Sequence, residues 1–120
     1  MKSGTSVLRY SQGKCGNILE CVLSLNHREV KSYNALVKRG PMRVEELSEV
    51  LGRHRSTASR CLARLEACGI CRKRKVKLDR GGFFFVYEAL PKDEVKRLLR
   101  ACTDKWYEDK KKAIDNFLEG

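Results

Sequence analysis

The sequence lacks any apolar run of the roughly 18–20 residues that a membrane-spanning helix requires. It also lacks the apolar core of a secretion signal, because only Lys2 precedes an N-terminal stretch rich in Ser and Gly. We therefore expect a cytoplasmic protein. Acidic residues are scarce too: 15 Asp and Glu accompany 26 Lys and Arg, and the net charge is +11 over 120 residues. Such an excess predicts a polyanionic partner, either a nucleic acid or an anionic membrane surface.

Motifs for catalysis are also absent from the sequence. No phosphate-binding loop, nucleophile elbow or metal-binding histidine pair occurs in it. His27 and His54 lie 27 residues apart, and neither has a neighbouring Ser, Cys or carboxylate in a catalytic pattern. We expect no enzymatic activity, no cofactor and no metal site.

The six cysteines allow more than one interpretation. Cys68 and Cys71 form a Cys-x-x-Cys pair after a predicted helix, whereas a reactive pair lies at a helix N-terminus, where the dipole lowers the thiol pKa. A structural zinc site needs four ligands, and no second pair of this kind exists in the sequence. Packed thiols are the favoured interpretation, and a disulfide or redox switch at Cys68 and Cys71 remains open.

Most of the net charge is concentrated in one segment. Residues 53–80 hold ten Lys and Arg against Glu66 and Asp79, which gives +8 in 28 residues and leaves +3 for the other 92. Residues 92–120 are nearly neutral, with eight basic and seven acidic side chains. A charged run taken alone often marks only a solvated face. The local structure of residues 53–80 therefore decides what their charge is for.

Helix signals follow one another along the first half of the chain. Asn17 and Asn26 are each followed three residues later by Glu, which is the spacing of a capping box and predicts helices starting near residues 18 and 27. A third helix is expected at residues 44–51 and a fourth at about 55–68. The fourth carries apolar residues at spacings of three and four: Ala58, Cys61, Leu62, Leu65 and Cys68.

The third and fourth helices are separated by a turn of three to four residues, and the fourth is basic, which is typical of a helix-turn-helix. Short side chains bring such a helix close to a groove floor, and arginines reach phosphates and guanine edges. The side opposite the apolar stripe carries Arg55, Ser56, Ser59, Arg60, Ala63 and Arg64.

Two β-prone runs, residues 70–78 and 83–89, surround a Gly-Gly turn and predict a hairpin. We expect the aromatic residues 83–85 to anchor this hairpin to the core while its basic strand and tip face the partner. Arg80 at the tip is suited to a minor groove, where the negative potential attracts arginine.

A long helix is predicted from Pro91 onward, over about 26 residues or roughly 39 Å. Such a helix exceeds the width of a small domain, so its apolar stripe needs a second surface, for which a copy of the chain is the simplest source. The alternative is that the helix folds back on its own domain. The stripe contains Val95, Leu98, Leu99, Cys102, Trp106, Ala113, Ile114 and Phe117.

Residues 25–30, 40–42, 45–48, 55–60 and 65–70 resemble the TrmB/MarR-type winged-helix regulators of archaea and bacteria. The resemblance covers about residues 18–90, and its most specific part is the Leu-Glu-x-x-Gly-Ile ending followed by a basic wing. It implies a recognition helix that enters the major groove with Arg55, Ser56, Thr57, Ser59, Arg60 and Arg64. His54 stands where these proteins carry a good N-cap, which allows a helix start at Ser56. We expect no counterpart of their sugar-binding effector domain, so sugar sensing is not implied.

The sequence thus predicts a mainly α-helical fold with a two-stranded β wing. It comprises a flexible arm (1–16), a winged helix-turn-helix domain (17–90) and a C-terminal dimerisation helix (91–120). The predicted function is sequence-specific binding of double-stranded DNA by a homodimer that regulates transcription, with no membrane partner and an unknown effector. An RNA-binding or ribosome-associated module and a thiol-based redox-responsive repressor are alternatives. The predicted DNA contacts are Arg53, Arg55, Ser56, Thr57, Ser59, Arg60, Arg64, Arg72, Lys73, Arg74, Lys75, Lys77 and Arg80.

Overall fold

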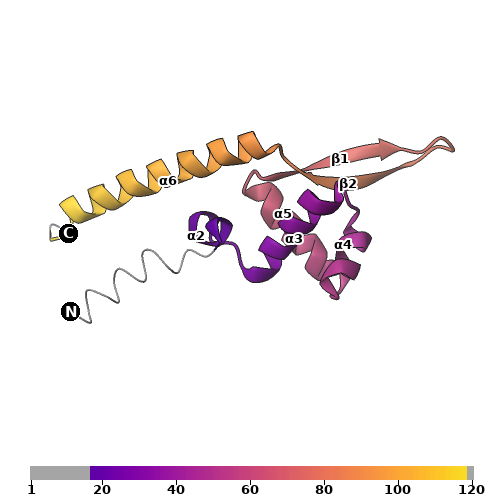
Figure 1. Cartoon of the computed structure of the whole chain (residues 1–120), viewed down its shortest axis with the longest axis horizontal. Helices are drawn as coiled ribbons and strands as arrows, with labels where there is room; N and C mark the ends of the chain where they lie inside the picture. Colours follow the sequence, from indigo (N-terminus) through magenta and orange to yellow (C-terminus); the bar gives the residue numbers. More distant parts are fainter. Residues whose placement is uncertain (1–16, 119–120) are drawn as a thin grey trace.

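A computed structural model describes residues 17–118 and confirms a mainly helical fold with one antiparallel hairpin (Figure 1). The predicted arm, residues 1–16, lies outside the described residues. No helix in the described part is long and apolar enough to cross a membrane. The elements in chain order are α2 (Ile18–Leu23), α3 (His27–Arg39), α4 (Val44–Leu51), α5 (Arg55–Ala67), β1 (Cys71–Lys77), β2 (Phe83–Ala89) and α6 (Lys92–Asp115).

Both asparagine caps predicted from the sequence are present, but of the two predicted capping boxes only the Asn26–Glu29 one is formed. Asn26 Oδ1 accepts a hydrogen bond from the Glu29 N–H at 2.8 Å, and Glu29 Oε1 accepts one from the Asn26 N–H at 2.9 Å. Asn17 Oδ1 accepts a bond from the Leu19 N–H at 2.8 Å. Each cap accepts hydrogen bonds from backbone N–H groups that have no partner within the helix. Such a cap contributes about 1 kcal/mol to the stability of the folded protein. Helices α2 and α3 therefore start where the sequence predicts.

Helix α5 starts at Arg55, so the alternative start at Ser56 is wrong. His54 is its N-cap residue and has extended backbone angles, but its side chain makes no capping hydrogen bond. The helix ends at Ala67, and Gly69 then takes a positive φ of 81°. A left-handed conformation costs glycine little, so the chain can turn directly from α5 into β1.

The core lies among α3, α4 and α5, which contact one another and form one group of helices in Figure 1. Leu36, Leu47, Leu62 and Leu65 are fully buried there. Burying such a side chain contributes about 1.5–3 kcal/mol. The apolar stripe predicted for α5 is therefore its core face, and the opposite side of the helix is left to solvent.

The base of the hairpin is fixed to this core. Met42 and Tyr87, both buried, exchange two backbone hydrogen bonds: the Met42 N–H donates to the Tyr87 carbonyl at 2.9 Å, and the Tyr87 N–H donates to the Met42 carbonyl at 2.8 Å. Cys71 at the start of β1 is also buried. The far end of the hairpin extends beyond the helices (Figure 1).

Helix α6 runs away from the domain on the side opposite the hairpin tip, and the described chain is 65 Å long (Figure 1). Val95 belongs to the core, and Leu98 and Leu99 pack against it. The sequence assigns all three to dimerisation. Val95 is instead buried in its own domain, whereas Leu98 and Leu99 are half-buried and their assignment stays a prediction. The distal members of the stripe are exposed, with Ile114 at 72% and Phe117 at 76%.

Candidate nucleic-acid interface

The exposed side of α5 carries most of the polar residues predicted for the recognition helix. Arg55, Ser56, Ser59 and Arg60 are exposed, and Thr57 is half-buried. Their common orientation follows from the helical period, because the residues between them fill the core. Arg53, in the turn before α5, is exposed as well. The helix therefore presents two short hydroxyl side chains between two arginines.

Arg64 does not share this arrangement. Its Nη2 donates a hydrogen bond to the carbonyl oxygen of Leu23 at 3.1 Å, and its Nε lies 3.9 Å from Glu29 Oε1. Leu23 is the last residue of α2, and the final carbonyls of a helix lack partners within the helix. Arg64 thus ties α5 to the α2–α3 junction instead of extending the surface that contains Arg60.

The strand register divides the basic residues of β1 between two faces of the hairpin. Lys73, Lys75 and Lys77 lie opposite Tyr87, Phe85 and Phe83 respectively. Because successive residues of a strand point to opposite faces, the arginines of β1 lie on the other side. The basic residues of β1 therefore do not form one continuous cationic surface: the lysines lie on one face of the hairpin and the arginines on the other.

The arginine face of the hairpin is partly neutralised by Glu88. Arg72 Nε lies 2.6 Å and Arg74 Nε 3.2 Å from the two oxygens of this carboxylate. The hydrogen bond from Arg72, with smaller contributions from Arg74, holds the pKa of Glu88 below its usual value. Counting charges within residues 53–80 does not reveal this pairing, since Glu88 lies in the second strand.

The lysine face carries exposed aromatic rings. Lys73 Nζ lies 4.3 Å from the centroid of the Phe85 ring, and Lys75 Nζ lies 4.1 Å from that of Phe83. The two rings meet edge to face, with centroids 5.3 Å apart, and are 50% (Phe83) and 40% (Phe85) exposed. The expectation that these rings fill the core is wrong, because the hairpin extends past the core and only its base reaches it.

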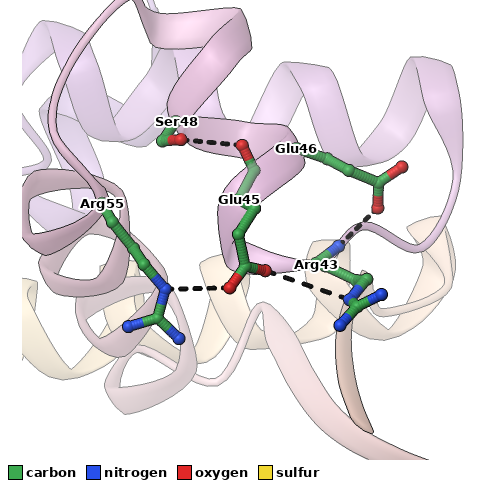
Figure 2. Close-up of polar contacts among 5 residues, drawn as sticks. All are labelled: Arg43, Glu45, Glu46, Ser48 and Arg55. Carbon is green, nitrogen blue, oxygen red and sulfur yellow. Dashed lines mark hydrogen bonds and ion pairs between the residues drawn. The ribbon is translucent and has the colours of Figure 1, made fainter.

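A second cluster joins the start of α4 to the start of α5 (Figure 2). Glu45 Oε2 accepts a hydrogen bond from Arg55 Nε at 2.9 Å, and Glu45 Oε1 lies 3.9 Å from Arg43 Nε. The guanidinium carbon of Arg43 lies 4.4 Å from the centroid of the Phe84 ring in the hairpin. Arg43 is not among the predicted contacts, because it precedes the basic segment 53–80.

Two further groups fix this cluster in place. Glu46 Oε1 accepts a hydrogen bond from the Arg43 N–H at 2.8 Å, and Ser48 Oγ donates to the Glu45 carbonyl at 2.7 Å (Figure 2). A backbone hydrogen bond at Glu45 itself, followed by the bond from Arg55, lowers the pKa of the Glu45 carboxyl. Glu45 is therefore ionised at neutral pH.

The cysteines of the described residues are mostly reduced. Cys61, Cys68, Cys71 and Cys102 are free thiols, and Cys21 is disulfide-bonded. Burial, with a smaller effect of the Glu66 charge, raises the pKa of Cys71 to about 12. A thiol with so high a pKa is a poor nucleophile at neutral pH, which weighs against a redox switch at Cys68 and Cys71. The described residues contain no group of three or more His, Cys, Asp or Glu that could hold a metal ion.

Comparison with known proteins identifies relatives of this chain. Residues 19–93 match the family described as sugar-specific transcriptional regulator TrmB. An uncharacterized protein of Methanocaldococcus jannaschii is 31% identical over 103 residues, which is 86% of this chain and 85% of that protein. A second uncharacterized protein of the same organism is 29% identical over 99 residues, which is 82% and 75% of the two chains.

Solved structures with the same fold include proteins of other archaea. A possible transcriptional regulator from Methanosarcina mazei superposes with a TM-score of 0.71 at 18% identity, over 86% of this chain and 87% of that one. The ST1889 protein from Sulfolobus tokodaii superposes with a TM-score of 0.62 at 16% identity, over 77% and 90% of the two chains. At these identities the likeness concerns the winged-helix fold.

Proposed function

Since the chain belongs to the TrmB family of transcriptional regulators, we propose that it recognises specific sequences in double-stranded DNA and does so as a homodimer. One observation carries the proposal: α5 exposes Arg55, Ser56, Ser59 and Arg60 side by side, and a basic hairpin projects from the same domain. Hydroxyls and arginines at helical spacing suit the base edges and phosphates of a major groove.

The two basic elements have different tasks in this proposal. Helix α5 enters the major groove, where Arg60 contacts a base or a phosphate. The hairpin follows the flanking backbone with its lysine face and reaches the minor groove with Arg80 at its exposed turn. Affinity therefore decreases steeply with salt, because each neutralised phosphate adds about −0.9 to the slope of log K against log salt concentration.

Helix α6 supplies the contact between the two copies. Trp106 and Ile114 on α6 and Phe117 just after it are 60–76% exposed in the single subunit, and exposed apolar side chains that occur together mark an interaction surface. Two subunits joined in this way place their recognition helices in successive major grooves about 34 Å apart. In this division residues 17–90 bind DNA and residues 91–120 bind the second copy.

We further propose that the protein acts by binding alone, without catalysis, and that it resides in the cytoplasm, where the DNA of an archaeal or bacterial cell is found. We do not infer a sugar ligand, because the family match is confined to residues 19–93, which form the winged-helix part.

The proposal is tested by selecting a preferred duplex from a random pool and measuring the affinity of Arg60→Ala for it. A lost base contact costs on the order of 1–3 kcal/mol, or about 5- to 150-fold in Kd. Arg97→Ala, which removes the same charge from an exposed site on α6, is the control and changes the affinity far less. Failure to enrich any duplex, or equal affinities of Arg60→Ala and Arg97→Ala, would contradict the proposal.

One observation favours a second candidate, the binding of RNA or unpaired strands. Exposed Phe83 and Phe85 beside lysines form the kind of surface on which unpaired bases stack. Titrating the protein with a structured RNA and with the selected duplex at one salt concentration separates the candidates. Tighter RNA binding that is lost in Phe85→Ala would establish the second one.

A further inference from the structure

We propose that Arg55 reads a guanine in the major groove and that Glu45 is the residue that positions it; this inference rests on the DNA-binding function proposed above. Arg55 donates to Glu45 through Nε at 2.9 Å. A guanidinium carries five N–H donors, so the four on the two Nη atoms are not used by this bond. In Figure 2 the dashed line from Glu45 ends on Arg55 Nε and not on either Nη atom. That free edge matches guanine, whose O6 and N7 accept two parallel hydrogen bonds from arginine.

Glu45 is itself held in a fixed position, as a positioning residue must be. It lies in the first turn of α4, whose start is secured by the hydrogen bond from the Arg43 N–H to Glu46. Its second carboxylate oxygen faces Arg43, and the Arg43 guanidinium lies over the Phe84 ring. The orientation of Arg55 is therefore tied both to α4 and to the hairpin.

The ion pair between this carboxylate and Arg55 adds little to folding stability. The side chains of Arg55 and Glu45 are 67% and 55% exposed, and exposed ion pairs contribute little to stability. A negative charge next to the proposed interface also repels phosphates, so it weakens binding to every sequence. What the charge provides is a fixed orientation of Arg55, which favours one base over the others. Glu45 thus lowers the affinity for DNA of any sequence and raises the preference for the recognised base.

The chain contains a matched control for testing this. Glu45→Gln and Glu46→Gln remove the same charge at adjacent positions of one helix turn. Glutamine at position 46 can still accept the capping hydrogen bond from the Arg43 N–H. Glutamine at position 45 can still accept from Arg55 Nε, but without the negative charge this bond is weaker. Only the substitution at position 45 weakens the contact with Arg55. Any general electrostatic effect on DNA binding is therefore common to both variants.

The experiment uses the full chain and the duplex selected from the random pool. Kd is measured for that duplex, for a random duplex, and for duplexes in which one guanine at a time is replaced by 7-deazaguanine, which lacks the N7 acceptor. At one guanine we expect about a tenfold loss for the parent and for Glu46→Gln, the scale of a bidentate base contact. For Glu45→Gln we expect the same replacement to reduce the affinity by about threefold or less, because the contact of Arg55 with N7 is already weakened. For Arg55→Ala we expect no reduction, because that contact is absent. Both glutamine variants bind random DNA more tightly than the parent.

Circular dichroism spectra matching the parent establish that the variants are folded. Equal sensitivity of Glu45→Gln and Glu46→Gln to 7-deazaguanine would overturn the role of Glu45, and a tenfold effect that persists in Arg55→Ala would overturn guanine reading by Arg55. A parent protein that does not distinguish the selected duplex from random DNA contradicts the proposed function itself, which is a different result from either of these.

Discussion

Replacing Ile114 by alanine tests the proposed dimer without disturbing the fold of the subunit. Ile114 is 72% exposed and lies on the part of α6 beyond Leu98 and Leu99, which pack against the core. Alanine is the strongest helix former, so the change does not weaken the helix. Its effect therefore falls on whatever covers Ile114 in the assembly.

The expected magnitude follows from the exposure and the symmetry. Burying an isoleucine side chain completely contributes about 1.5–3 kcal/mol, and alanine retains only a small part of that. At about 2 kcal/mol for each copy, a two-fold dimer loses about 4 kcal/mol because both subunits carry the change. A loss of this size raises the dimer dissociation constant about a thousandfold.

Sedimentation equilibrium over a range of protein concentrations measures this constant directly. Val37→Ala is the control, because Val37 is 56% exposed on α3 and is not part of the contact proposed for the distal half of α6, so its truncation leaves the constant unchanged. Equal dissociation constants for Ile114→Ala and the parent would refute the assignment of Ile114 to the interface. A parent protein that remains monomeric at all concentrations while fully folded would refute the dimer.

Three further predictions concern the core, a thiol and the hairpin. Leu62→Ala, at a fully buried site, lowers the free energy of unfolding by about 2–5 kcal/mol, measured by urea denaturation. Burial raises the pKa of Cys71 to about 12, whereas the thiol of the unfolded chain loses its proton near pH 8.5. The contribution of Cys71 to stability is therefore complete below about pH 8.5 and decreases by up to about 1.4 kcal/mol per pH unit above it. A parent and a Cys71→Ala variant whose stabilities fall equally from pH 8 to 10 would contradict this. Because Arg72 and Arg74 lower the pKa of Glu88, the pairing is complete above the ordinary carboxyl pKa of about 4.3 and is lost as the pH falls through the lower folded value. Acid titration followed by NMR of the Glu88 carboxyl carbon measures that pKa, and an ordinary value would show the pair to be absent in solution.

Features encoded by short-range patterns were predicted well from the sequence. The asparagine caps at Asn17 and Asn26 and the Gly81-Gly82 turn depend on residues a few positions apart, and the corresponding elements begin and end within one or two residues of expectation. The apolar stripe of α5 is a local pattern as well, since its period fixes which side of the helix is buried.

Features that depend on contacts between distant segments were not predictable in this way. Arg64 has the spacing of a recognition-helix residue, yet the free carbonyl of Leu23, 41 positions earlier, binds it. Glu88 is 16 positions from Arg72, and their contact depends on the hairpin register. The exposure of the rings on β2 depends on how far the hairpin projects past the core. Composition and periodicity contain none of this information.

The continuity of α6 has a consequence for how operators diverge. Val95 fixes the first turn of this helix to the same core that holds α5, so α6 joins the proposed dimer contact to the recognition helix without a flexible joint. Inserting one residue between Leu99 and Trp106 would turn the distal face by about 100° and shift it by about 1.5 Å along the axis. The distance and angle between two half-sites would change, while the bases recognised within each half-site would stay the same. Under the proposed function, small changes in the length of α6 would alter how two half-sites are arranged without altering the sequence of either half-site.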